Sequence, residues 1–216
     1  MIPTPGERRA RYDDFVASVH DLCTNPGIRA ALAKGRGRPV EQCGFMDRYL
    51  TRSTAGRPGR RAHYTIAGLI ALAGPAAHTP GVRAQPTSAN PPRNTASHAL
   101  PVMPDSPAIT PVALAADEAV DWARRRNLGA TFAAAVTTRG YNEERTGEQL
   151  HVLTRLGDDQ VHRRLPSHLT RLLGDGLTPD WAVLLSDLIQ RPYQRDAVSL
   201  RWRDSFYLAL HTPDRR

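Results

Sequence analysis

The residues of this sequence with the most evident chemistry are arginines, which gather in short clusters. The most distinctive is Arg36-Gly37-Arg38-Pro39, which has the composition of an AT-hook, a short element that lays arginines into a narrow minor groove. Here the tetrapeptide joins two predicted helices, where Gly and Pro are ordinary turn residues, so a turn is the favoured interpretation. Guanidinium groups on such a turn could still contact phosphate, whose geometry they match.

Further arginines cluster at residues 57–61, 163–171 and 191–203, on predicted helices or directly before them. Each cluster alone is most simply a solvent-exposed helix face. Together they lie in a chain of net charge +8, with 29 basic and 21 acidic residues, and they predict a basic stripe. The codon bias of a GC-rich genome explains why all basic residues except Lys34 are arginines, but not the excess of positive charge. That excess favours an anionic partner, and nucleic acid first.

No pattern of catalytic or metal-binding residues accompanies the arginines. The sequence contains no P-loop, no His-Glu-x-x-His, no Gly-x-Ser-x-Gly and no dinucleotide-binding fingerprint. His151, His162 and His168 match no metal-ligand spacing, and histidines among arginines on a helix are expected to be surface or nucleic-acid contacts. We therefore expect no enzyme activity, no cofactor and no bound metal.

Four other residues could carry chemistry, but each has a simpler structural role. Asp180 is expected to lie at a helix N-terminus, and Asp187, on the same helix face, to pair with an arginine. Cys23 and Cys43 are expected to be reduced thiols on packed helices. No apolar run approaches the roughly 20 residues that span a bilayer, and no signal peptide is visible, so we expect a cytoplasmic protein without membrane contact.

Hydrophobic periodicity divides the chain into two helical regions and a linker. Residues 1–78 are predicted to form helices, among them an amphipathic helix from Tyr12, one capped by Asn25, a short one at 40–50 and a buried one at 62–74. Residues 79–114 are rich in Pro, Ala, Ser and Thr, and are predicted to form a disordered or extended linker.

Residues 115–216 are predicted to form a second helical bundle. The expected helices cover residues 117–126, 127–138, 143–156, 158–173 with a kink at Pro166, 178–188 and 196–210. The expected fold is therefore all-α, with about eight to nine helices in two small bundles. Trp122, Trp181, Trp202 and Phe206 fall on core-facing positions, so backbone charge contacts are a better prospect than base stacking.

Several segments, in this order, resemble the CasB family, the small subunit of the type I-E CRISPR Cascade complex. They are residues 25–32 (Asn-Pro-Gly-Ile-Arg-Ala-Ala-Leu), 67–72 (Ala-Gly-Leu-Ile-Ala-Leu), 127–130 (Asn-Leu-Gly-Ala) and 165–207. The last contains Asp-Trp-x-x-Leu-Leu-x-Asp-Leu from Asp180 and Val-x-x-x-Trp-x-x-x-Phe-Tyr from Val198. The family often has a tryptophan directly after the first of these motifs, whereas this chain has Ile-Gln-Arg at 189–191.

The resemblance implies a non-catalytic subunit that dimerises head to tail along the complex, beside the backbone and large subunits. Its basic face would stabilise the arrangement of guide RNA and target DNA and the displaced non-target strand of the R-loop. Carried over by position, the nucleic-acid-binding residues would be Arg29, Arg57, Arg60, Arg145, Arg171 and Arg195. Charge alone adds Lys34, Arg36, Arg38, Arg163 and Arg164.

Two other interpretations remain open at this point. A free-standing, non-specific DNA-binding protein would use the Arg36-Gly37-Arg38-Pro39 turn and would bind duplex DNA tightly by itself. A helical hydrolase is a third possibility, but no constellation of residues supports it.

Overall fold

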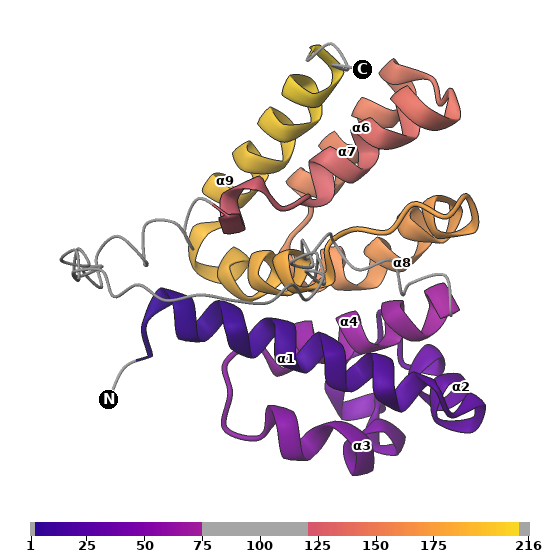
Figure 1. Ribbon diagram of the computed structural model, residues 1–216, viewed down its shortest axis with the longest axis vertical. Coiled ribbons are helices and arrows are strands. Elements are labelled where there is room, and N and C mark those ends of the chain that lie inside the picture. Colours follow the sequence, from indigo (N-terminus) through magenta and orange to yellow (C-terminus); the bar gives the residue numbers. More distant parts are fainter. Residues whose placement is uncertain (1–2, 75–120, 212–216) are drawn as a thin grey trace, which may run out of the picture.

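The computed structural model describes residues 3–74 and 121–211 (Figure 1). The expected linker at 79–114, and part of the expected helix at 117–126, lie outside the described residues. The helices in chain order are α1 (Pro5–Cys23), α2 (Pro26–Lys34), the short 3₁₀ helix η1 (Val40–Gln42), α3 (Gly44–Thr54), α4 (Arg60–Ala73), α6 (Leu128–Arg139), α7 (Glu143–Arg155), α8 (Asp158–Gly174) and α9 (Trp181–His211). No strand occurs in the described parts of the chain, and the predicted all-α class is confirmed.

Side chains that replace missing helical hydrogen bonds set several helix starts. Asn25 caps α2 as predicted, because its Oδ1 accepts from the backbone N–H groups of Gly27 (2.9 Å) and Ile28 (3.2 Å). Asn127 caps α6 in the same way, through Ala130 N (3.1 Å). Thr4 and Glu7 form a capping box that starts α1 earlier than the apolar pattern indicated. These starts are encoded locally.

Helix α4 is the central element of the molecule, as its nearly all-apolar sequence predicted. Its residues 62–71 are all buried. It packs against α1, α2 and α3 on the N-terminal side and against α8 and α9 on the C-terminal side, and Figure 1 shows it between the two groups. One continuous cluster of buried apolar side chains includes Phe15 and Leu69 as well as Leu165 and Trp202. The two groups of helices therefore share one core.

The prediction of two separate helices at 178–188 and 196–210 is confirmed. The element labelled α9 (Trp181–His211) consists of two helices that meet at a kink, where Gln194 has non-helical backbone (φ −139°, ψ 44°). Pro192 has no N–H for the helix ladder, but contacts across the kink keep the two halves together. Trp202 Nε1 donates to Asp187 (2.6 Å), and the side chain of Arg201 also pairs with Asp187. The predicted arginine partner of Asp187 is thus confirmed.

Three smaller differences concern helix ends. Helix α9 begins at Trp181 and not at residue 178, and Asp180 caps it, since its Oδ1 accepts from Ala182 N and Val183 N at 3.1 Å each. The short helix predicted at 40–50 is split into η1 and α3, with Cys43 between them. Helix α8 continues as one element through Pro166.

Helices α6 and α9 approach each other very closely at Gly129. A Cβ atom at this position would lie only 1.8 Å from the backbone oxygen of Trp202. The glycine of the Asn-Leu-Gly-Ala segment is therefore required by packing, because the backbone of α9 occupies the space of a side chain.

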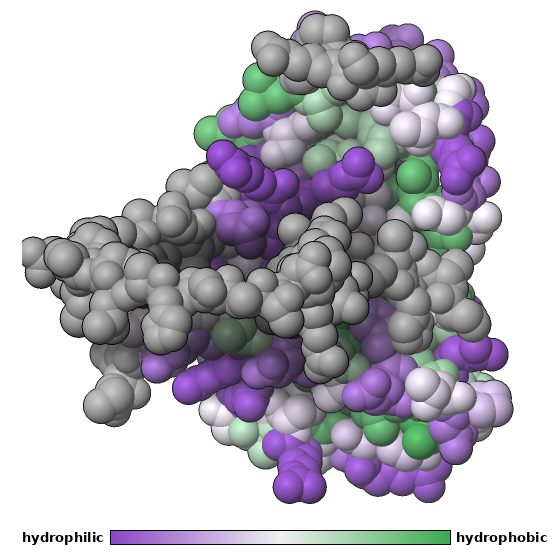
Figure 2. All heavy atoms as spheres, viewed as in Figure 1, coloured by the Kyte–Doolittle hydropathy of each residue, from purple (hydrophilic) through white to green (hydrophobic). Residues whose placement is uncertain are grey.

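The surface seen in Figure 2 mixes polar and apolar residues. On the face in Figure 2, hydrophobic residues form separate small areas among hydrophilic ones. Among the helices that the structure describes, none is long and apolar enough to cross a membrane.

Candidate nucleic-acid interface

The basic turn between α2 and η1 is docked on helix α8. Gly37 has φ of +73°, a conformation that favours glycine. A Cβ atom on Gly37 would lie 3.1 Å from the backbone oxygen of His162, 3.2 Å from that of Arg163 and 3.3 Å from Cγ of Pro166. The predicted turn is confirmed, and the structure adds a tertiary contact that holds it.

Helix α4 supports the same turn from the other side. A Cβ atom on Gly68 of α4 would lie 2.9 Å from Cα of Arg36 and 3.0 Å from its backbone nitrogen. The turn is therefore wedged between two helices, with a glycine at each contact. Its arginines project from a fixed backbone, unlike those of a flexible hook.

This docking brings together four of the arginines proposed from charge. Gly37 lies against the backbone of His162 and Arg163, so Arg36 and Arg38 flank the segment of α8 that carries Arg163 and Arg164, and all four arginines are exposed. We call these four residues the turn–α8 patch. Arg36 Nη1 donates to Ala33 O (2.8 Å) at the end of α2, which restricts its side chain.

The carboxylate of Asp159 neutralises part of this region. It pairs with Arg163 and with Arg61, and hydrogen bonding to Arg61 lowers the pKa of Asp159. Among the residues that the structure describes, neither Arg38 nor Arg164 has a carboxylate partner. These two guanidinium groups are therefore available to an external anion.

His162 lies beneath the patch rather than in it, which corrects the expectation of a surface or nucleic-acid contact. Its side chain is buried, and Nδ1 is 2.9 Å from Thr65 Oγ1 on α4. Burial lowers the pKa of His162 to about 4, and the nearby Arg61 acts in the same direction. His162 is therefore neutral at physiological pH and joins α4 to α8.

The other residues proposed in the N-terminal half lie outside the turn–α8 patch. Arg29 is half-buried on α2, and Lys34 is exposed at the end of that helix. Arg57 is exposed in the loop before α4. Arg60 links α3 to α4, because its Nη2 donates to Asp47 (3.0 Å) and to the Tyr64 hydroxyl (3.0 Å).

The other three residues proposed in the C-terminal half are not members of the patch. Arg145 is exposed in the first turn of α7. The guanidinium of Arg171 lies 4.2 Å from the ring centroid of Tyr141. Arg195 donates to the backbone oxygen of Arg155 at the end of α7. The proposed set therefore does not form one continuous site.

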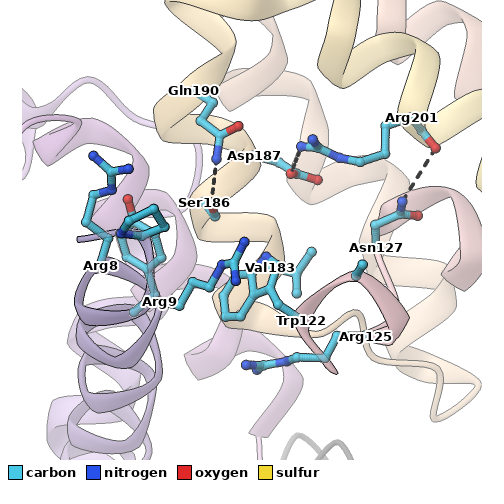
Figure 3. A pocket seen from close by; sticks show the side chains of 13 residues that line it. Arg8, Arg9, Trp122, Arg125, Asn127, Val183, Ser186, Asp187, Gln190 and Arg201 are labelled. Atoms are coloured by element: carbon cyan, nitrogen blue, oxygen red, sulfur yellow. Dashed lines mark hydrogen bonds and ion pairs between the residues drawn. The ribbon is translucent and has the colours of Figure 1, made fainter. Parts of the chain in front are cut away.

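A second group of arginines, absent from the proposed set, surrounds a pocket of about 340 Å³ between α1, residues 122–127 and α9 (Figure 3). Trp122 lines this pocket and is half-buried, which corrects its predicted place in the core. The arginines that line it are Arg8, Arg9, Arg125 and Arg201. Sequence clustering included Arg201 in the group at 191–203, but it could not show that Arg8, Arg9 and Arg125 from distant parts of the chain lie with it.

Comparison with known proteins agrees with this fold. A family model described as CRISPR-associated protein Cse2 matches residues 28–207. The chain belongs to the Cse2 family. The predicted resemblance to CasB, the Cascade small subunit, is thereby confirmed. The motifs at 67–72, 127–130 and 165–207 all lie within the matched Cse2 region.

Two solved structures are similar to this Cse2 protein over nearly its whole length. One, titled "CRISPR RNA-guided surveillance complex", has 26% sequence identity and a TM-score of 0.66, covering 94% of this chain and 95% of the other. The second, titled "CRISPR RNA-guided surveillance complex, pre-nicking", has the same identity and TM-score and covers 94% of both chains. No curated protein matches this Cse2 sequence.

Proposed function

We propose that this protein is a non-catalytic subunit of a type I-E Cascade surveillance complex, where it stabilises the R-loop through contacts to nucleic-acid backbone. Membership of the Cse2 family and the likeness to chains of RNA-guided surveillance complexes support this assignment. In such a complex its partners are the guide RNA, the target and non-target DNA strands, the other subunits and a second copy of this chain. Its place of action is the cytoplasm.

The observation that carries the proposal is the turn–α8 patch. Two exposed arginines on a rigid turn and two on α8 form a preorganised surface for phosphates. R-loop formation exchanges one duplex for another at near balance, so added protein–backbone contacts can shift it. Base pairing already supplies sequence specificity. A basic surface that reads only the backbone is therefore suited to this function.

The test combines Arg38→Gln with Arg164→Gln in the assembled complex. Both side chains are exposed and have no carboxylate partner among the described residues, so the fold should be preserved. We expect faster R-loop collapse, and a salt dependence of strand binding that is shallower by about 1.4 log units per log unit of salt if both arginines contact single-stranded backbone. Dissociation of labelled non-target strand across a salt series measures both.

A matched control combines Arg52→Gln with Arg139→Gln, which removes the same charge from two exposed positions away from the patch. Equal losses in both double variants would show a general charge effect and contradict the proposal. The free-standing DNA-binding alternative predicts tight duplex binding by the isolated chain, without guide RNA or other subunits. That result would replace the Cascade function as the main one.

A further inference from the structure

The pocket in Figure 3 is a strongly basic cavity with walls from three distant segments. Arg8 and Arg9 come from α1, and Figure 3 shows Arg9 extending across towards Trp122. Ser186 and Gln190 line the opposite wall on α9, and Arg201 lies beyond the kink of the same helix. Four arginines and a single aspartate line the pocket. It therefore favours an anion.

Not all of these arginines are free to bind a ligand. Arg125 uses its guanidinium on Asp13 and Asp180, at 2.6 to 2.9 Å, so its role is to fix the wall. Asp187 is 2% exposed and forms an ion pair with Arg201, so the charges of these two side chains offset each other and the net positive charge of the pocket comes from Arg8 and Arg9. Arg201 uses Nη2 for its contact with Asp187, and its other N–H groups can still donate to a ligand.

The α1 arginines are the ones positioned for an external partner. Arg8 is exposed, and the guanidinium of Arg9 lies 5.5 Å from the ring centroid of Trp122. Neither has a carboxylate partner among the described residues. The indole face holds Arg9 by a cation–π contact without using its N–H donors. Arg9 is thus oriented before a ligand arrives.

The α9 wall adds neutral hydrogen-bonding groups. Gln190 Nε2 donates to Ser186 Oγ at 2.8 Å. The Ser186 hydroxyl accepts this bond, so its own proton remains for another acceptor. Cationic and neutral donors therefore converge from two sides on a cavity of about 340 Å³, a volume typical of small-ligand sites.

We infer that this pocket binds a phosphate of single-stranded nucleic acid, with Arg8 and Arg9 as its principal ligands and Arg201 and Ser186 completing the site. This inference deepens the proposed function by adding a second contact point, distinct from the turn–α8 patch, for an unpaired strand. A phosphate could also come from a free nucleotide. A strand is favoured because Arg8 lines the pocket and is also exposed, so its guanidinium can bridge the bound phosphate to the next phosphate of a strand.

The test uses the full chain with a hexamer of thymidylate as the probe. Of the three tryptophans, Trp181 and Trp202 are 4% and 0% exposed, whereas Trp122 is half-buried and lines the pocket. A change of tryptophan fluorescence on titration therefore reports on Trp122. We expect Arg8→Gln with Arg9→Gln to weaken hexamer binding about tenfold and to reduce its salt slope by about 1.4.

Arg11→Gln with Arg52→Gln is the matched control, because it removes the same two charges from exposed positions that do not line the pocket. Unchanged hexamer affinity in the Arg8–Arg9 variant, or an equal loss in the Arg11–Arg52 variant, would overturn the inference. Saturation of the signal by thymidine 5′-monophosphate at the same concentration as the hexamer would show that a free nucleotide, and not a strand, is the source of the phosphate.

The inference and the proposed function can fail separately. If the pocket variant binds the hexamer normally while the Arg38–Arg164 variant destabilises R-loops, the inference fails and the proposed function stands. If the pocket variant weakens hexamer binding while the Arg38–Arg164 variant leaves R-loops stable, the inference stands and the role of the turn–α8 patch in the proposed function fails.

Discussion

At the scale of single residues, Arg191 is a charged side chain that lies inside the protein. It is 1% exposed, and its Nη2 donates to the backbone oxygens of Leu153 (3.1 Å), Thr154 (3.1 Å) and Leu156 (2.6 Å). These carbonyls lie at the end of α7, where helical partners run out. Arg191 therefore caps α7 from within α9, although its sequence neighbourhood suggests a basic surface. Its charge contributes little to nucleic-acid attraction.

His162 gives a prediction at the same scale. An unfolded histidine has a pKa of 6.5, whereas burial holds the pKa of His162 at about 4, so protonation on acidification favours the unfolded chain. The free energy of unfolding should fall by about 2 kcal/mol through this residue between pH 7 and pH 5. Urea unfolding at the two pH values measures the loss.

His162→Gln supplies the comparison. The Gln variant should lose about 2 kcal/mol less than the original chain over the same pH interval. The buried His63, whose pKa is also lowered chiefly by burial, acts in the same direction in both proteins and cancels in the difference. Identical pH dependence in the two chains would mean that His162 is protonated inside the fold, contrary to its surroundings.

At the scale of elements, the proline of α8 and the glycine of the basic turn fit each other. Pro166 has no N–H, so the carbonyl of His162, four residues earlier, lacks its usual helical donor. Gly37 approaches this carbonyl from the turn, at the place where any side chain would collide. The irregularity in α8 thus marks the docking point of the turn.

Gly37→Ala tests this docking, with Gly56→Ala as control. Both glycines have positive φ (73° and 68°), so each substitution carries a backbone cost of about 1–2 kcal/mol. A Cβ atom on Gly56 meets nothing within 4 Å, whereas one on Gly37 meets α8. Gly37→Ala should therefore lose more stability in urea and also weaken oligonucleotide binding, while Gly56→Ala leaves binding unchanged. Similar behaviour of the two variants would argue against a docked turn.

The helices also show which features of the fold can be predicted from the sequence. Caps such as Asn25 and the buried character of α4 depend on neighbours a few residues away, so both were predicted correctly. The break between the two helices of α9 was also predicted correctly, because Pro192 and the polar residues around it are a local signal. The contact of Asp187 with Trp202, 15 residues apart, which holds the two halves together, has no such signal. The place of Gly37 on α8 has no local signal at all.

At the scale of the whole molecule, Arg125 joins three segments. Its Nη1 and Nη2 donate to Asp13 of α1 (2.9 and 2.7 Å), and its Nε and Nη2 donate to Asp180 at the start of α9 (2.6 and 2.8 Å). Asp180 simultaneously caps α9. This arrangement, which we call the Arg125 clasp, ties the first helix to the last across the shared core. None of its three members was proposed as a partner of another from sequence, because they are far apart in the chain.

Arg125→Gln should lower the free energy of unfolding by about 1–3 kcal/mol, because Asp180 and Asp13 lose their donors. Arg124→Gln is the control, since Arg124 is an exposed neighbour with the same charge. The difference in urea midpoint between the two variants measures the clasp. Equal stability of the two variants would show that α1 is held by apolar packing alone.

The Arg125 clasp has a consequence for the order in which the chain matures during synthesis. Asp13 and Arg125 are 112 residues apart, and Asp180 follows Arg125 after another 55. A ribosome releases α1 before Arg125 and Asp180, so this helix must wait for both segments before its ionic partners exist. Closing so long a loop is slow compared with forming a helix. Helix α1 is therefore among the last of the described helices to reach its final set of contacts.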